Sequence, residues 1–195
     1  MSAARLSGDL DPCFDGDLPA RGVLEYFLDK AFEGARRHPP LSVALFRLEG
    51  LDDLEGDGSP ETAGHLVGMA SEVLSQLTRR MNVFGHLEGG IFLSLLPGED
   101  LKGANAYARR IVGGVATYPT ADGLPIAFNA GIAAYDPAME TSAALLDAAG
   151  RALDAASRLR GSRAVVCPGP GEPPAGPGLL LLGPEGDVTE APAPD

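Results

Sequence analysis

Two short apolar runs separated by a glycine turn constrain this chain more than any other feature. Residues 82–87 (NVFGHL) and 91–96 (IFLSLL) lie on either side of Glu88-Gly89-Gly90. A strand, a short glycine turn and a second strand are typical of a β-hairpin. The glycine pair could simply close the hairpin, or it could let the backbone approach the phosphates of a nucleotide.

Strands and helices surround this hairpin in a regular order. Residues 41–48 form a nearly continuous apolar run, as in a strand that is covered on both faces. Residues 124–135 predict another strand, and 163–166 predict a short edge strand. Apolar residues at helical spacing predict four helices. These helices cover 23–37, about 66–80, about 101–115 and 140–160.

Without the first and last helices, the order is strand, helix, strand, strand, helix, strand. This β-α-β-β-α-β core is the order of a ferredoxin-like or palm-type fold. We therefore predict an α+β protein with a two-layer core, in which an antiparallel sheet carries its helices on one face. An extra N-terminal helix and an extra C-terminal helix complete the prediction.

Length and charge limit the classes of function. The 195 residues suffice for one ordinary domain with tails, and the formal net charge of −12 repels nucleic acid and anionic lipid. Cys13 and Cys167 have no CxxC spacing, so they suggest neither a zinc site nor a disulfide framework. No apolar run is long enough to cross a bilayer. We expect a cytoplasmic protein with no membrane insertion.

Composition divides the chain into three parts. We predict a flexible N-terminus over 1–10, a domain over 11–166 and a disordered tail over 167–195, which is rich in proline, glycine and acidic residues. Within the tail, Leu179–Leu182 is unusually apolar. This segment is either a short strand or patch that folds back on the domain, or a linear docking motif for a partner.

Several segments together resemble a GGDEF domain, the diguanylate cyclase family, over roughly Asp11–Val166. The resemblance is carried by the hairpin, the order of elements, Gly64–Met69, Leu96–Gly98, Asn129–Tyr135 and Gly150–Val166. In that family the hairpin carries Gly-Gly-Asp/Glu-Glu-Phe and holds GTP. The first acidic residue of the motif helps to bind a divalent metal ion, and the second supports catalysis.

This chain departs from the family at each of these polar positions. The five motif positions correspond to Glu88, Gly89, Gly90, Ile91 and Phe92, so both acidic residues are replaced, by Gly90 and Ile91. The resemblance implies that the glycine pair derives from a phosphate-binding turn. With these replacements it would act mainly as a hairpin turn.

Other expected ligands of metal and nucleotide are also replaced. Arg47, in the sequence Phe-Arg-Leu-Glu49, stands where the family carries a metal-binding aspartate, and a guanidinium cannot coordinate Mg²⁺. Met69 replaces an aspartate that contacts guanine, and it cannot accept hydrogen bonds as a carboxylate does. Asp154 and Ser157 lie where the family has Tyr-x-x-Lys, whose lysine faces the phosphates.

One ligand site of the family is less altered. Active cyclases often carry an inhibitory Arg-x-x-Asp site for cyclic diguanylate before the hairpin, and Arg79 and Asn82 occupy its two ends. The arginine could pair with phosphate and the asparagine could bond a guanine edge. The simpler interpretation is a basic helix end that complements the helix dipole.

The resemblance and its departures favour a catalytically inactive regulatory or scaffolding module in bacterial-type signalling. It would act through protein contacts, with no catalytic residue, metal or cofactor. The alternative is a non-catalytic receptor for cyclic diguanylate or GTP. An active cyclase would need a different metal site, built from Glu49, Glu88 and the acidic loop, and we do not favour it. The protein partner and the oligomeric state stay open.

Overall fold

The computed structural model describes residues 14–15, 18–19, 21–51, 60–79, 82–117, 126–158, 164–166, 180–182 and 188–190. The predicted flexible N-terminus, most of the acidic loop after Glu49, and most of the predicted tail lie outside the described residues. Among the described helices, none has both the length and the apolar character that crossing a membrane requires.

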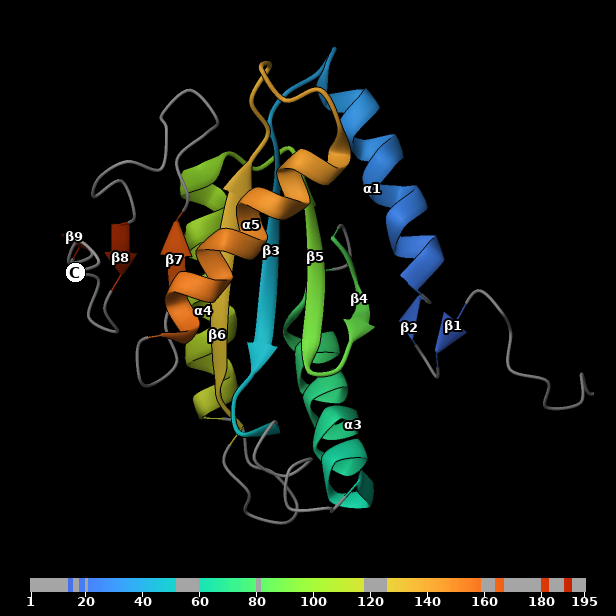
Figure 1. The fold of residues 1–195 in the computed structure, drawn as a ribbon, viewed down its shortest axis with the longest axis vertical. Coiled ribbons are helices and arrows are strands. Elements are labelled where there is room, and N and C mark those ends of the chain that lie inside the picture. Colours follow the sequence, from blue (N-terminus) through green and yellow to red (C-terminus); the bar gives the residue numbers. More distant parts are fainter. Residues whose placement is uncertain are drawn as a thin grey trace, which may run out of the picture.

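The elements follow the predicted order (Figure 1). The helices are α1 (Arg21–Ala35), α3 (Pro60–Leu77), α4 (Leu101–Ala116) and α5 (Ser142–Ser157). The strands of the main sheet are β3 (Leu41–Leu48), β4 (Val83–Glu88), β5 (Ile91–Pro97), β6 (Phe128–Ala134), β7 (Ala164–Val166), β8 (Leu180–Leu182) and β9 (Val188–Glu190). Two very short strands, β1 (Phe14–Asp15) and β2 (Leu18–Pro19), pair separately.

The main sheet has the order β4-β5-β3-β6-β7-β8-β9. The four strands β4, β5, β3 and β6 pair antiparallel, which confirms the predicted α+β core. Only β6 and β7 pair in parallel among the described strands. The predicted edge strand at 163–166 is therefore present as β7, although it is not the outermost strand.

The two helices of the predicted core cover one face of the sheet, as predicted, and the two extra helices cover the other. α3 and α4 pack on one face of the sheet, and α1 and α5 pack on the other, as Figure 1 shows for α4 behind the sheet and α5 in front of it. The cause lies in β3, whose alternate side chains are apolar on both sides. Ala44 and Phe46 face α3 and α4, whereas Val43 and Leu45 face the other pair. Both faces therefore need a cover.

Local sequence explains where the helices begin. Proline occupies the first position of α3, where its fixed φ suits the first turn and its missing N–H is not needed. The helix therefore begins at Pro60, before the apolar stripe that predicted it from about residue 66. Asp100 caps α4 by accepting a hydrogen bond of 2.8 Å from the Gly103 N–H. Thr141 caps α5 in the same way.

Part of the predicted tail is ordered into strands. Leu180–Leu182 pairs antiparallel with β7, and Val188–Glu190 pairs antiparallel with β8. Of the two interpretations of Leu179–Leu182, the structure therefore has the strand that folds back, with Leu179 itself outside the described residues. The prediction of disorder does not hold for these two segments, because β7 would otherwise be an edge with unpaired backbone groups, and a run of leucines can pair with it.

Candidate functional site

The hairpin has the geometry that the sequence predicts. Gly89 has a φ of +50°, in the region that favours glycine, and Glu88 pairs with Ile91 across the turn. His86 forms a hydrogen bond through Nε2 to the Gly89 carbonyl. Phe92 is fully buried and stacks on Phe84 with ring centroids 5.8 Å apart. This turn thus closes a hairpin that is anchored in the core.

Several replaced positions lie together where β3 ends. Arg47 is opposite Ile91 of β5 on one side and opposite Asn129 of β6 on the other. Paired residues point to the same face of a sheet, so these three side chains face α5. The structure therefore brings together the positions expected for the metal and the catalytic acid.

Arg47 reaches from this strand to α5. Its Nη1 donates to Ser157 Oγ at 3.0 Å, and its Nη2 donates to Asp154 Oδ1 at 3.1 Å. The Arg47 side chain is 34% exposed, whereas that of Asp154 is 61% exposed. Asp154 and Ser157 are the two positions at which the expected tyrosine and lysine are replaced. The arginine at the expected metal position is therefore bonded to the residues at the expected phosphate position.

Glu49 is held by a buried amide. Asn129 is 4% exposed, and its Nδ2 donates to Glu49 Oε1 at 2.8 Å. The Asn129 Oδ1 atom is buried and has no hydrogen-bond partner among the described residues. This bond links Glu49, directly after β3, to β6.

Space at Gly90 is limited by two leucines. A Cβ built on Gly90 would lie 2.9 Å from Leu51 Cδ2 and 3.0 Å from Leu48 Cβ. The Gly90 carbonyl accepts the Leu48 N–H at 2.8 Å, which fixes the backbone. At position 90, where the family carries an acidic residue, the space for a side chain is thus occupied by leucine side chains.

Glu88 belongs to an exposed ionic cluster at the start of α1. Its Oε2 lies 2.5 Å from Arg21 Nη1, and Arg21 Nε also pairs with Glu25 at 2.8 Å. The hydrogen bond that Arg21 donates to Glu25, followed by the charge of Glu88, raises the pKa of Arg21 above its ordinary value. Arg21 therefore stays charged throughout the physiological pH range and links α1 to the hairpin.

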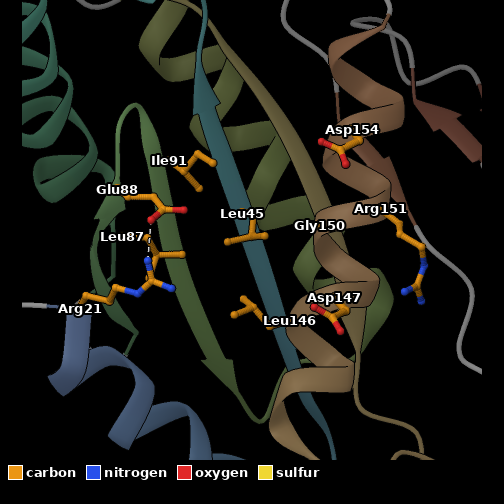
Figure 2. A pocket seen from close by; sticks show the side chains of 10 residues that line it. All are labelled: Arg21, Leu45, Leu87, Glu88, Ile91, Leu146, Asp147, Gly150, Arg151 and Asp154. Carbon is orange, nitrogen blue, oxygen red and sulfur yellow. Dashed lines mark hydrogen bonds and ion pairs between the residues drawn. The ribbon is translucent and has the colours of Figure 1, made fainter.

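A groove of about 410 Å³ opens beside these residues, between the hairpin and α5 (Figure 2). Its floor and walls are apolar, and its rim carries charges of both signs. The lining residues are Arg21, Leu45, Leu87, Glu88, Ile91, Leu146, Asp147, Gly150, Arg151 and Asp154. Figure 2 shows Glu88 and Arg21 together on the hairpin side, and Asp147, Arg151 and Asp154 on α5.

Three other predicted site residues lie apart from this cluster. Met69 lies on α3 and packs against the core on the opposite face of the sheet from Arg47. Arg79 and Asn82 lie between α3 and β4, where the Asn82 N–H donates to the Arg79 carbonyl at 3.0 Å. The Arg79 side chain is 66% exposed, and its Nη1 lies 3.5 Å from Glu99 Oε1. These two residues form a separate candidate site.

Among the described residues, those at the expected metal positions do not fit a divalent metal. Magnesium needs several oxygen ligands, but Arg47 brings a positive charge and Gly90 brings no side chain. The two remaining carboxylates, Glu49 and Glu88, are bonded to Asn129 and Arg21. Within the described ranges, no group of three or more histidine, cysteine or acidic residues is arranged to hold a metal.

Comparison with known families explains this arrangement. The family described as "Diguanylate cyclase, GGDEF domain" matches residues 16–163, most of the chain. The chain belongs to the GGDEF family. The matched range includes every element from β2 to α5, so the resemblance noted in the sequence extends over the whole described core.

Solved GGDEF structures share this fold. The active GGEEF domain of a diguanylate cyclase from Vibrio cholerae aligns with a TM-score of 0.71 and 18% identity, covering 78% of this chain and 99% of that one. The GGDEF domain of DgcB from Caulobacter crescentus, solved with c-di-GMP, aligns with a TM-score of 0.72 and 18% identity, covering 80% and 96%. The GGDEF domain of PA1120 (TpbB or YfiN) from Pseudomonas aeruginosa aligns with a TM-score of 0.68 and 25% identity, covering 77% and 91%. A search of curated proteins gives no significant match.

Two residues of this GGDEF domain's site were missed at the sequence level. Asn129 is a polar residue within an otherwise apolar strand, and that interruption was an available signal. Arg21 gave no signal, because its contact with Glu88 joins residues 67 positions apart. The bonds from Arg47 to α5 also gave no signal in the sequence, although Asp154 and Ser157 were each recognised as replacements.

Proposed function

We propose that this GGDEF domain does not convert GTP and acts as a regulatory or scaffolding module in cyclic diguanylate signalling. The observation that supports this most is the bonding of Arg47 to Asp154 and Ser157. A positive side chain occupies the position proposed for a metal ligand, and its partners occupy the positions proposed for phosphate contacts. These polar side chains bond to one another within the chain.

The chemistry of phosphoryl transfer explains why this arrangement matters. Catalysis of such reactions rests almost entirely on metal ions and positioned charge that stabilise the transition state. Here the cation is a guanidinium that cannot be exchanged for Mg²⁺, and Ile91 offers no carboxylate at the second motif position. The surrounding core is nevertheless complete, with Phe92 and Phe128 fully buried. A retained fold without these groups supports a role through binding.

A protein partner is the proposed ligand class. GGDEF domains are known in complexes with regulatory proteins, since the diguanylate cyclase SiaD from Pseudomonas aeruginosa was solved with its activator SiaC. That structure aligns with a TM-score of 0.70 and 21% identity, covering 77% of this chain and 59% of that one. We propose that this domain likewise contacts a regulatory protein, here without turnover.

The test is a turnover assay with purified protein, GTP and Mg²⁺ or Mn²⁺, in which products are separated chromatographically. An active GGDEF domain serves as the positive control. We expect no cyclic diguanylate above the level of a protein-free sample. Metal-dependent product that disappears in the Glu88→Ala and Glu49→Ala variants would refute the proposal, because it would require a site built from those carboxylates.

A second candidate function is a receptor for cyclic diguanylate or GTP. It is favoured by the exposure of Arg79, whose contact with Glu99 is long for a salt bridge and is itself exposed to solvent. Some GGDEF domains with this fold were solved with c-di-GMP. Titration calorimetry of each ligand into the wild type, into Arg79→Ala and into a control variant, Lys30→Ala, tests it. Lys30 is an exposed basic residue on α1, so this variant removes the same charge elsewhere on the surface. Binding that only Arg79→Ala removes would establish the receptor, and absence of heat in the wild type would end this candidate.

A further inference from the structure

The outer face of α5 carries a charge pattern that is unusual in its symmetry. Five exposed charged residues lie along this face, and four of them form a pattern in which the acidic ones occupy its first half and the basic ones its second half. These four are Glu140, just before the helix, and Asp147, Arg151 and Arg158. Asp154 lies on the same face, but it forms an ion pair with Arg47 at 3.1 Å.

The two central charges are not explained by contacts within the protein. Asp147 and Arg151 are spaced i, i+4, which often gives an ion pair along a helix. Across the described ranges, however, neither residue forms an ion pair or a side-chain hydrogen bond, and Figure 2 marks no interaction between them. The helix dipole does not account for them either, because it acts within the first and last turns and these residues lie mid-helix.

The surface around Asp147 and Arg151 has the shape that helix packing needs. These two residues line both the groove of about 410 Å³ and a second hollow of about 380 Å³. They therefore form a ridge with an open groove on either side. Gly150 lies next to the ridge, and a Cβ there would meet nothing within 4 Å. Ridges formed by i, i+4 residues pack into such grooves on a partner helix, and a glycine allows a close approach.

Symmetry indicates which partner would fit. If a second α5 packs antiparallel about a two-fold axis that crosses the outer face midway between Asp147 and Arg151, Asp147 of each copy faces Arg151 of the other, and Glu140 faces Arg158. Asp154, which is paired with Arg47 within its own chain, then faces Ala144 of the other copy. A parallel arrangement would instead place like charges together, which is unfavourable. A two-fold interface requires this kind of reciprocal complementarity, in which residue i meets j and j meets i.

We propose that the outer face of α5 is a self-complementary interface on which a second copy of this chain packs antiparallel. The apolar groove wall formed by Leu146, Leu87 and Ile91 is then covered by the partner's helix. This interface is independent of the proposed loss of turnover, since the charged residues that form it neither replace a motif position nor contact Arg47. The two proposals therefore fail or hold separately.

The experiment measures the association of the full chain by sedimentation velocity over a range of micromolar concentrations. The variants are Asp147→Arg, Arg151→Asp and the double variant that exchanges both charges. The buffer has an ionic strength of about 0.15 M, where a Debye length of about 8 Å screens repulsion between two chains of net charge −12 more than contacts at the interface. Glu61→Arg and Lys102→Glu make the same changes in net charge elsewhere on the surface. Circular dichroism melts show which variants fold.

The expected outcome has three parts. The wild type and both surface controls form a dimer, and each single reversal weakens association at least about tenfold, because like charges then meet twice. The exchanged double variant regains the dimer. Mixing the two single variants also yields a dimer, because the two basic side chains of the Asp147→Arg copy then face the two acidic side chains of the Arg151→Asp copy.

Any of three results would overturn the proposal. A wild type that stays monomeric throughout the range removes the interface. A dimer that tolerates both single reversals lies on another surface. Single reversals that abolish the dimer, with no recovery in the double variant or in the mixture, would show that Asp147 and Arg151 do not face one another.

Discussion

The contact between Arg47 and Asp154 makes a quantitative prediction through a double-mutant cycle. Arg47→Ala, Asp154→Ala and the double variant are compared with the wild type by urea unfolding, at concentrations where the chain is monomeric. Exposed ion pairs contribute about 0.2–1 kcal/mol, and hydrogen bonds to charged groups contribute about 1.5–3 kcal/mol. With Arg47 34% exposed and Asp154 61% exposed, this pair lies between the two classes. We expect a coupling free energy of about 1 kcal/mol.

The single variants should differ in a defined way. Arg47→Ala should lower the free energy of unfolding by about 2 kcal/mol, because it also removes the bond to Ser157 and the packing of the side-chain stem. Asp154→Ala should lower it by about 1 kcal/mol, since a largely exposed carboxylate loses one charged bond. The double variant should then lose about 2 kcal/mol instead of the additive value of about 3 kcal/mol. High salt should reduce the coupling.

A matched control and a refuting result complete this test. Arg21 and Glu88 form an ion pair in which both side chains are more than half exposed, so the same cycle there should show a much smaller coupling. If the losses at Arg47 and Asp154 are additive within error, the two side chains do not interact in solution. The main structural support for the proposed function would then be lost.

Three further predictions concern core packing, a buried hydrogen bond and a helix cap, and each is measured by urea unfolding. Gly131→Ala should lower the free energy of unfolding by about 3 kcal/mol or more, because its Cβ would lie 2.2 Å from the Leu153 backbone nitrogen. The control Gly113→Ala has open space around it, so it should be neutral or raise the free energy of unfolding by up to about 1 kcal/mol. Equal effects of the two substitutions would contradict the packing of α5 on β6. Tyr107→Phe should lower the free energy of unfolding by about 1–2 kcal/mol, because the hydroxyl of the fully buried Ser94 loses its hydrogen-bond partner at 2.8 Å. An unchanged free energy of unfolding would refute that bond. Asp100→Ala should lower the free energy of unfolding by about 1 kcal/mol, because it removes the cap of α4. Asp100→Asn should keep most of the capping free energy, since asparagine also caps helices. Equal losses in the two variants would argue against capping.

Much of the fold could be predicted because each element carries its own pattern. Residues 41–48 were predicted as a strand and form β3 with those bounds, since a run of eight mostly apolar residues between a proline pair and an acidic loop has few alternatives. The same run is apolar on both faces, and the sheet is covered on both. The sequence did not assign the first and last helices to a face, because an apolar stripe on a helix does not show which side of a sheet it covers.

The candidate site could be predicted only in part. The replacement of residues at positions 47, 69, 90 and 91 is visible in the sequence, because the resemblance supplies what to expect there. Their new contacts are not visible, since Arg47 and Asp154 are 107 positions apart and no local pattern links a strand end to the last turns of a distant helix. Long-range side-chain pairing depends on the packed fold, so it required the structure.

These contacts bear on whether catalysis could be regained by simple substitution. On the proposed correspondence, Arg47→Asp would lose both bonds to α5 and would place a second carboxylate opposite Asp154, so like charges would meet. A side chain at position 90 would overlap Leu51 and Leu48, which are buried. Each single return to a family residue would therefore destabilise the domain before it supplied a metal ligand. Loss of turnover, as we propose it, is consequently a property of several mutually fitted residues and not of the two missing carboxylates alone.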